Sequence, residues 1–334
     1  MTYIYKPTFK MKNLKYLLIG LPLTFMASCS SEDNTIEEDP KAYPIIVTVT
    51  EKPLGNTEGA KKGIKRAPIV TTTSLESFSL FYEGEDIGYG STIGTFKKQG
   101  THWESDQPWP SQYLGINGDK VLNFYAFNAG ESYSKQYEEA CIYVEVDEAS
   151  DEQVDLLAAK NSVSYQSGNG VVPLTFDHIS AAVQVNLRKT ETISEYNVNV
   201  SEVILHNIKY CGEYYFDRED PWVPFDDLTN YTIVAYQRGG LEVGTNLLPL
   251  AGEGEYLFLL PQTLTGWNKS APLGDCYIEI KCKIFNGEGY KVGSADDDAS
   301  VYLPLTATIQ MGIINALNIS MGTALRDSNG NKIF

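Results

Sequence analysis

Residues 276–284 read Cys276-Tyr277-Ile278-Glu279-Ile280-Lys281-Cys282-Lys283-Ile284. The even-numbered positions are all apolar, and three of the four odd-numbered positions are charged. Because successive side chains of a β-strand point to opposite faces, this alternation predicts a strand with one face in a core and the other in water.

The same period of two recurs along the chain. Apolar and polar residues also alternate at 78–82 and 179–187, which predicts further half-buried strands. Residues 121–127 and 256–260 are apolar almost throughout, and we expect strands that are buried on both faces there. No segment has the pattern of a long, capped amphipathic helix. We therefore expect an all-β fold of the β-sandwich class, with turns at the frequent Gly, Pro, Asn and Asp residues.

The composition is acidic. The 334 residues carry a formal charge of −17, and 43% of them are hydrophobic, which is ample for packed cores. The charge becomes −21 if residues 1–28 are removed, because they hold four lysines and no acidic residue. Such a surface repels nucleic-acid phosphates, so we expect no nucleic-acid partner.

The N-terminus has the form of an export signal. Lys12 and Lys15 precede an apolar run at 16–25, which at about ten residues is shorter than the roughly twenty that span a bilayer. Met26-Ala27-Ser28-Cys29 then has the form of a lipobox. We expect residues 1–28 to be a signal peptide and Cys29 to be lipidated. The alternative is a plain signal peptide in which Cys29 has no special role.

The residues after Cys29 are polar and acidic as far as Pro40, and too few are apolar to build a core. They predict a flexible tether. They also resemble the acidic export signal that directs some lipoproteins of Gram-negative anaerobes to the outer face of the outer membrane. We expect a surface-exposed lipoprotein of the cell outer membrane.

A short strand is expected at 44–50, with Ile45, Val47 and Val49 on one face. The next residues, 51–65, are rich in Gly and Lys, and they lead to Arg66. Exposed loops of this kind are preferred sites of proteolysis. The sequence thus predicts a strand joined to the main body by a cleavable loop, or else an ordinary long connection that happens to be basic.

The sequence offers little for catalysis or metal binding. The three histidines, His102, His178 and His206, are far apart, and no zinc-protease, nucleophile-elbow or phosphate-loop motif occurs. The acidic runs at 217–220 and 296–298 lack the ligand spacing of a dedicated calcium loop. We expect no enzyme activity, no catalytic residue, no metal site and no cofactor.

The cysteines beyond Cys29 show no zinc-binding spacing, and Cys276 and Cys282 on one extended strand are too far apart to bridge. We expect buried free thiols. The tryptophans offer an alternative function, because exposed indoles can stack on sugars. They are Trp103, Trp109, Trp222 and Trp267.

Several segments together resemble the fimbrillin family, the lipoprotein precursors of type V pilins in Gram-negative anaerobes. The resemblance covers nearly the whole chain and depends on the order of the segments. They are the lipobox, Arg66-Ala67-Pro68-Ile69, 75–81, Trp109-Pro110, 122–127, 155–159, 173–185 and Leu259-Leu260-Pro261-Gln262.

The resemblance implies two transthyretin-like, Greek-key β-sandwich domains, at 67–168 and 169–334. The first would be completed by strand 44–50 from a lipidated, detachable segment at 29–66. A polar, glycine-rich patch at 165–170 agrees with this boundary. The resemblance also implies cleavage by an arginine-specific protease, and Arg66 and Ala67 match the cleaved pair. A strand from a neighbouring subunit would then replace the one removed.

A donor strand needs alternating apolar residues near an end of the chain. The best candidate comprises Ile309, Met311, Ile313, Leu317 and Ile319. The alternative is that this segment is simply the last strand of the second domain.

These expectations define a structural subunit of a cell-surface fimbrium that is assembled by strand exchange and supports adhesion. The alternatives are a fimbrial anchor or tip adhesin, or a non-polymerising surface lipoprotein that binds glycans. The expected partners are other fimbrial subunits, outer-membrane lipid through Cys29, an arginine-specific protease, and a host or bacterial surface ligand.

Overall fold

The computed structural model describes ten stretches of the chain. They are 43–56, 70–71, 74–87, 94–129, 131–132, 139–149, 152–225, 231–250, 256–267 and 275–334. The predicted lipidation site Cys29 and the predicted cleavage pair Arg66–Ala67 lie outside these residues, as do the signal peptide and the acidic tether.

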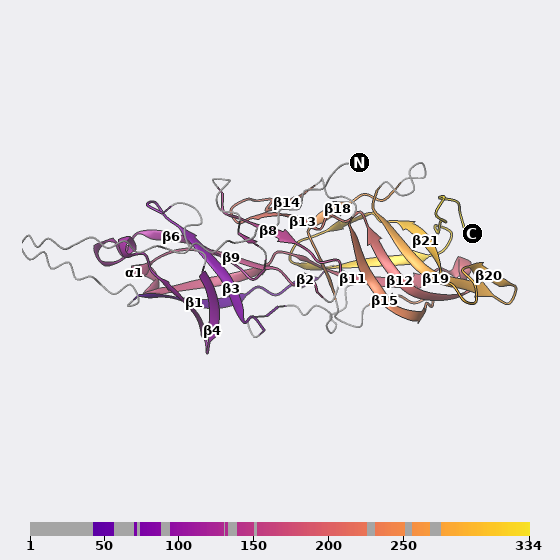
Figure 1. Cartoon of the computed structure of the whole chain (residues 1–334), viewed down its shortest axis with the longest axis horizontal. Helices are drawn as coiled ribbons and strands as arrows, with labels where there is room; N and C mark the ends of the chain where they lie inside the picture. Colours follow the sequence, from indigo (N-terminus) through magenta and orange to yellow (C-terminus); the bar gives the residue numbers. More distant parts are fainter. Residues whose placement is uncertain are drawn as a thin grey trace, which may run out of the picture. The chain divides into compact units, whose positions relative to one another are not determined.

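Strands dominate the described residues, which confirms the all-β class (Figure 1). Seven of them form a sheet that closes on itself. In order around the ring they are β1 (Pro44–Glu51), β10 (Val171–His178), β9 (Leu157–Ser164), β6 (Val121–Phe127), β3 (Ser77–Glu83), β4 (Gly94–Gln99) and β5 (His102–Pro108). The ring closes because β1 pairs with β10 on one side and with β5 on the other.

Two five-stranded sheets are built largely from later residues. The first has the order β16 (Leu248–Pro249), β11 (Ala181–Lys189), β23 (Ile313–Met321) and β2 (Gly55–Asn56), with β17 (Leu257–Leu259) also pairing with β11. The second has the order β15 (Thr232–Glu242), β12 (Asn197–His206), β19 (Tyr277–Asn286) and β20 (Gly289–Val292), with β21 (Ala299–Pro304) also pairing with β19.

The remaining elements of the described chain are short. A further sheet has the order β14 (Trp222–Pro224), β13 (Cys211–Tyr215), β8 (Cys141–Glu145) and β7 (Glu131–Ser132), and β18 (Gln262–Leu264) pairs with β22 (Ala307–Ile309). The helical turns are α1 (Tyr165–Gly168), η2 (Ser111–Tyr113), η3 (Gly115–Asn117) and η4 (Glu191–Ile193). No helix in the described stretches is long and apolar enough to span a bilayer.

Strand β19 has the two faces that its sequence predicts. Ile278, Ile280, Cys282 and Ile284 are buried, while the residues between them are only partly buried. The strand lies between β12 and β21 and pairs with both along most of its length. The local alternation therefore predicted this strand and its buried face correctly.

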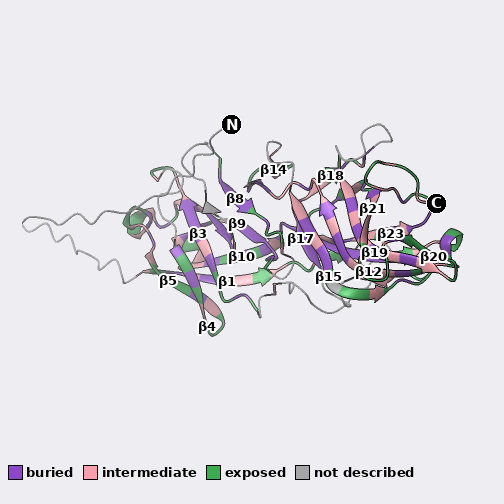
Figure 2. Cartoon of the chain, turned by 45° about the vertical axis from the view of Figure 1, so that its right-hand side comes forward, coloured by how far each residue is buried: buried purple, intermediate pink, exposed green. Residues whose placement is uncertain are grey.

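Strand β6 is buried on both faces because it lies between two hydrophobic cores, and Figure 2 shows buried residues along its paired neighbours β3 and β9. Leu122 and Phe124 belong to the core inside the closed sheet, which we call the ring core. Tyr125 and Phe127, on the opposite face, belong to a larger core that continues into the later sheets. Its neighbour β3 divides in the same way, because Phe81 joins the larger core.

The expectation of a half-exposed strand at 179–187 is wrong, because β11 is buried on both faces. Ala182, on the side expected to meet water, packs with Tyr256, Phe258 and Ile314 in a small separate core. On the same side, the Asn186 side-chain amide donates a hydrogen bond of 2.8 Å to the Asn318 side-chain oxygen.

The division into two domains near residue 168 stays a prediction. The polar patch there forms the single turn α1, which Ser164 caps by accepting a hydrogen bond from the backbone N–H of Ser167. Beyond that turn, β10 pairs with β1 and β9, so the strand after the predicted boundary still belongs to the closed sheet.

The four cysteines within the described residues are free thiols, and Cys282 lies in the interior of β19 with none of its surface exposed. Burial raises the pKa of the Cys282 thiol to about 12. Because the thiolate is the reactive form, a buried thiol with a raised pKa is inert.

We expect Cys282 in the folded protein to resist iodoacetamide at about pH 8, where an accessible cysteine is partly ionised. Mass spectrometry of the alkylated peptides measures the modification. The same residue should react readily after unfolding in urea. Rapid alkylation of Cys282 in the folded protein would show that the interior of β19 is accessible.

Candidate functional site

The site expected from the sequence is the place that strand β1 occupies. The strand runs parallel to β10, with Ile46 opposite Val171 and Glu51 opposite Phe176. It runs antiparallel to β5, with Val47 opposite Trp103. The backbone of β1 is therefore paired along both of its edges, and its removal would leave unpaired edges on β5 and β10.

The side chains of β1 enter the ring core. Ile45 and Val47 have 0% of their surface exposed, and Val49 is half-buried against the same core. Fully burying one such aliphatic side chain contributes about 1.5–3 kcal/mol to stability. The seat of β1 is accordingly an apolar slot with a sheet edge on each side.

The ends of the segment are held by further contacts. The backbone N–H of Trp109 donates to the Tyr43 carbonyl oxygen at 2.8 Å, and that of Lys52 donates to the Phe176 carbonyl oxygen at 2.9 Å. The Lys52 ammonium lies 2.8 Å from the carboxylate of Asp177 in β10. The fixed segment thus extends from Tyr43 to at least Lys52.

We expect Ile45→Ala in the uncleaved chain to lower the free energy of unfolding by about 2–5 kcal/mol, because it leaves a cavity in a core. Urea unfolding followed by tryptophan fluorescence measures the effect. Thr48→Ala is the matched control, because Thr48 is exposed on the same strand. Equal effects of the two changes would mean that the core does not depend on β1.

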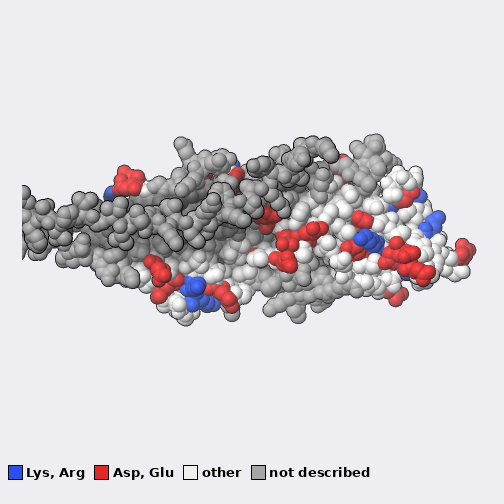
Figure 3. Space-filling model, viewed as in Figure 1, with Lys and Arg blue, Asp and Glu red and all other residues white. Residues whose placement is uncertain are grey.

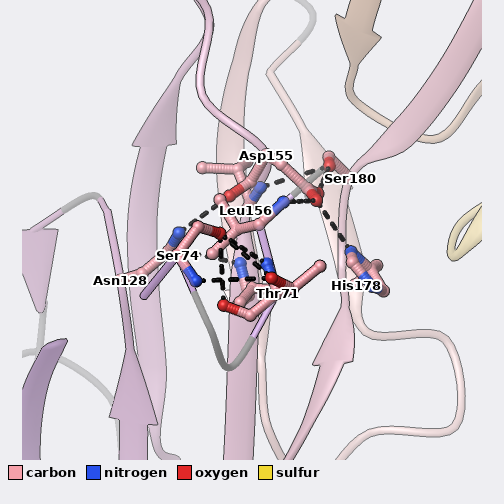
Figure 4. A network of polar contacts seen from close by, with 9 residues as sticks. Thr71, Ser74, Asn128, Asp155, Leu156, His178 and Ser180 are labelled. Carbon is pink, nitrogen blue, oxygen red and sulfur yellow. Dashed lines mark hydrogen bonds and ion pairs between the residues drawn. The ribbon is translucent and has the colours of Figure 1, made fainter. Parts of the chain in front are cut away.

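A buried polar network holds the chain on the other side of the predicted cleavage pair (Figure 4). The carboxylate of Asp155 accepts hydrogen bonds from the backbone N–H of Val70 at 2.9 Å, from Nδ1–H of His178 at 2.8 Å and from the Ser180 hydroxyl at 3.1 Å. The Asn128 side-chain amide donates to the Asp155 carbonyl oxygen at 2.8 Å.

This network explains His178, which we expected to be structural rather than a metal ligand. The ring is buried, and it is oriented by the Asp155 carboxylate. The network also fixes Val70, four residues after Arg66, to the interior of the protein. No motif in the sequence indicated this site, although Asp155 and His178 both lie in segments that resemble the fimbrillin family.

We expect Asp155→Asn to destabilise the fold by about 3 kcal/mol, because it removes the charge that pairs with three donors in the interior. Thermal unfolding measures the loss. Asp106→Asn, at an exposed position of β5, serves as the control. If the two variants unfold at the same temperature, the network does not anchor the segment at Val70.

The residues predicted as a donor strand lie in two elements. Ile309 is buried in β22, Met311 is exposed between the strands, and Ile313, Leu317 and Ile319 belong to β23. In this structure β23 is the parallel neighbour of β11 from Ala182–Ile314 to Lys189–Met321, and β2 pairs with the start of its other edge at Ile313 and Ile314. This placement matches the alternative of a last strand in the second part of the chain.

The alternative prediction of a glycan-binding site made of exposed tryptophans is wrong. All four are buried: Trp103, Trp109, Trp222 and Trp267 have 3%, 2%, 7% and 9% of their surface exposed. Two indole N–H groups donate to carbonyl oxygens in the interior, that of Trp109 to Gly170 and that of Trp222 to Ile179. The rings of Trp103, Trp109 and Trp222 lie in the two larger cores, and that of Trp267 stacks on Tyr277.

The two other histidines form separate pairs with carboxylates. Nε2 of His102 lies 2.6 Å from Glu104, and Nε2 of His206 lies 2.8 Å from Glu279. Within the described residues, no group of three or more His, Cys, Asp or Glu side chains could hold a metal ion.

A profile of the fimbrillin-like family matches residues 72–331, which is more than half of the chain. The chain belongs to the fimbrillin-like family. This match confirms the resemblance drawn from the sequence. The matched region begins after β1 and β2. It therefore contains the strands that pair with β1, but not β1 itself.

One solved structure shares the fold of this chain. The crystal structure of a fimbrial protein from Bacteroides vulgatus aligns over 83% of this chain and 95% of its own, with 16% identity and a TM-score of 0.51. A candidate cell adhesion protein from Bacteroides ovatus aligns over 84% and 94%, with 13% identity and a TM-score of 0.44. Another from Bacteroides uniformis aligns over 86% and 96%, with 12% identity and a TM-score of 0.41. The comparison with curated proteins gave no match.

Proposed function

We propose that this fimbrillin-like chain is a structural subunit of a cell-surface fimbrium, and that it accepts a strand from another subunit in the seat of β1. The burial of Ile45 and Val47 between β5 and β10 is the observation that carries this proposal. Membership of the fimbrillin-like family supports it, and the proposed role is structural and adhesive rather than enzymatic.

The proposed trigger is cleavage between Arg66 and Ala67 by an arginine-specific protease. After the cut, β1 would be held in the ring by non-covalent contacts alone. Its departure would expose an apolar slot and two sheet edges, and such edges are templates for pairing with another chain. A head-to-tail contact of this kind does not close on itself, so it generates an open filament.

The proposed location is the outer face of the outer membrane, with lipidated Cys29 and the acidic tether holding the precursor at the lipid surface. The covalently attached β1 would keep the slot filled until processing. Acidic side chains are widespread on the described part of the face in Figure 3, so we propose a protein or other non-anionic surface, not nucleic acid, as the adhesion partner.

One observation favours an anchor or tip subunit over a stalk subunit. A stalk subunit must both accept and donate a strand, but in this structure β23 is paired with β11 along most of its length and with β2 at Ile313 and Ile314. If β23 were the donor, it would have to separate from β11 along its whole length. An anchor or a tip needs only one of the two activities.

Treatment of the purified full-length protein with an arginine-specific protease tests the proposal. We expect cleavage to yield a body that begins at Ala67, to release the upstream segment, and to allow assembly with other subunits that electron microscopy detects. Arg66→Ala should remain intact and unassembled, whereas Lys65→Ala, the neighbouring control, should behave like the unmodified chain. Assembly by Arg66→Ala, or a cleaved body that never exchanges its strand, would contradict the proposal.

A further inference from the structure

The segment that contains β1 makes a second contact beyond the closed sheet. Only three residues separate the end of β1 from β2, which pairs in parallel with β23. Gly55 lies opposite Ile313, and its backbone N–H donates to the Gly312 carbonyl oxygen at 3.1 Å. The same stretch of chain thus completes the ring and covers an edge of another sheet.

The residue before β2 is apolar and covers a small core. Leu54 is partly buried against a cluster made of Ala182, Tyr256, Phe258 and Ile314. This is the cluster that buries the unexpected second face of β11. Leu54 therefore covers apolar side chains that would otherwise meet water.

Gly55 suits the close approach of this segment to β23. A Cβ atom at this position would lie 2.8 Å from Cγ2 of Ile313, which is closer than real Cβ contacts allow. Only glycine fits there without displacing Ile313. The fit between β2 and β23 is thus built into the sequence of both strands.

The two contacts follow one continuous path. β1 is parallel to β10, and two residues connect β10 to β11. β2 is parallel to β23, which is itself parallel to β11. A single extended segment can therefore follow the body from β10 to β23 without reversing its direction.

We infer that residues 43–56 form a two-site clip, and that the body has a second acceptor site made of the β23 edge and the core under Leu54. This inference rests on the proposed exchange of β1. We expect the two acceptor sites to be occupied by one extended segment of another fimbrial subunit, which runs parallel to β10 and β23. That segment needs apolar residues at the positions of Ile45, Val47 and Leu54, and a glycine directly after the last of them.

The test measures how fast the upstream segment leaves the body after cleavage at Arg66, in variants with one substitution each. Gel filtration and mass spectrometry follow the release. We expect Leu54→Asp to speed this release about tenfold, because the charge cannot be buried against the small core. Pro53→Asp is the matched control, because it adds the same charge at an adjacent exposed residue. Val47→Asp reports on the first site.

The outcomes separate the inference from the proposed function. Faster release by both Val47→Asp and Leu54→Asp supports the clip. If Val47→Asp acts but Leu54→Asp matches Pro53→Asp, the second site is overturned while the exchange of β1 stands. If no variant alters the release, both fall.

Hydrogen exchange on the unmodified chain gives an independent measurement that does not depend on the folding of a variant. The backbone amides of Ile313 and Ile314, the two residues opposite β2, are compared before and after the upstream segment leaves the cleaved body. We expect them to lose protection when the β23 edge is uncovered. Unchanged protection at these amides would overturn the second site.

Discussion

The pairing of β1 with β10 and β5 is the contact on which the closed sheet depends. It joins residues far apart in sequence, such as Ile46 and Val171, so the ring closes through a long-range contact rather than a hairpin. A closed sheet has no exposed edge, and this one is closed by the segment that precedes the predicted cut. Whatever removes β1 therefore opens the sheet and its core together.

The sequence was sufficient for features that local backbone geometry decides. Period-two alternation identified β19 and its buried face, because the side chains of any strand alternate whatever lies next to it. The alternation could not show whether another part of the chain packs on the polar face of a strand. Gln184 and Asn186 look like solvent-facing residues, yet both are buried, and Ala182 on the same face packs with Tyr256 and Phe258. The buried tryptophans were unpredictable for a related reason, since a large ring packs well in a core and its N–H can find a partner there, as that of Trp222 does.

In the candidate site, too, the sequence pattern predicted some residues and not others. Ile45 and Val47 were identifiable from their spacing, whereas the network around Asp155 was not. Its members meet because β9 and β10 pair with Leu157 opposite His178, which brings Asp155 beside the histidine. No short motif encodes that register. Leu54 was equally hidden, because one apolar residue in a polar stretch has no periodicity to reveal its contact.

The positions of the anchored residues determine what a cut after Arg66 would do. Upstream, 43–56 are held without covalent bonds, by strand pairing and by apolar contacts with the ring core and with the small core under Leu54. Downstream, the N–H of Val70 is fixed by the buried carboxylate of Asp155. The cut would thus free one piece while Val70 stays bound to Asp155. Release of the free piece would then depend on local opening of β1 and β2, whose free energy is set by the few residues that they bury. Those residues determine both how securely the precursor is capped and how readily another subunit replaces the cap.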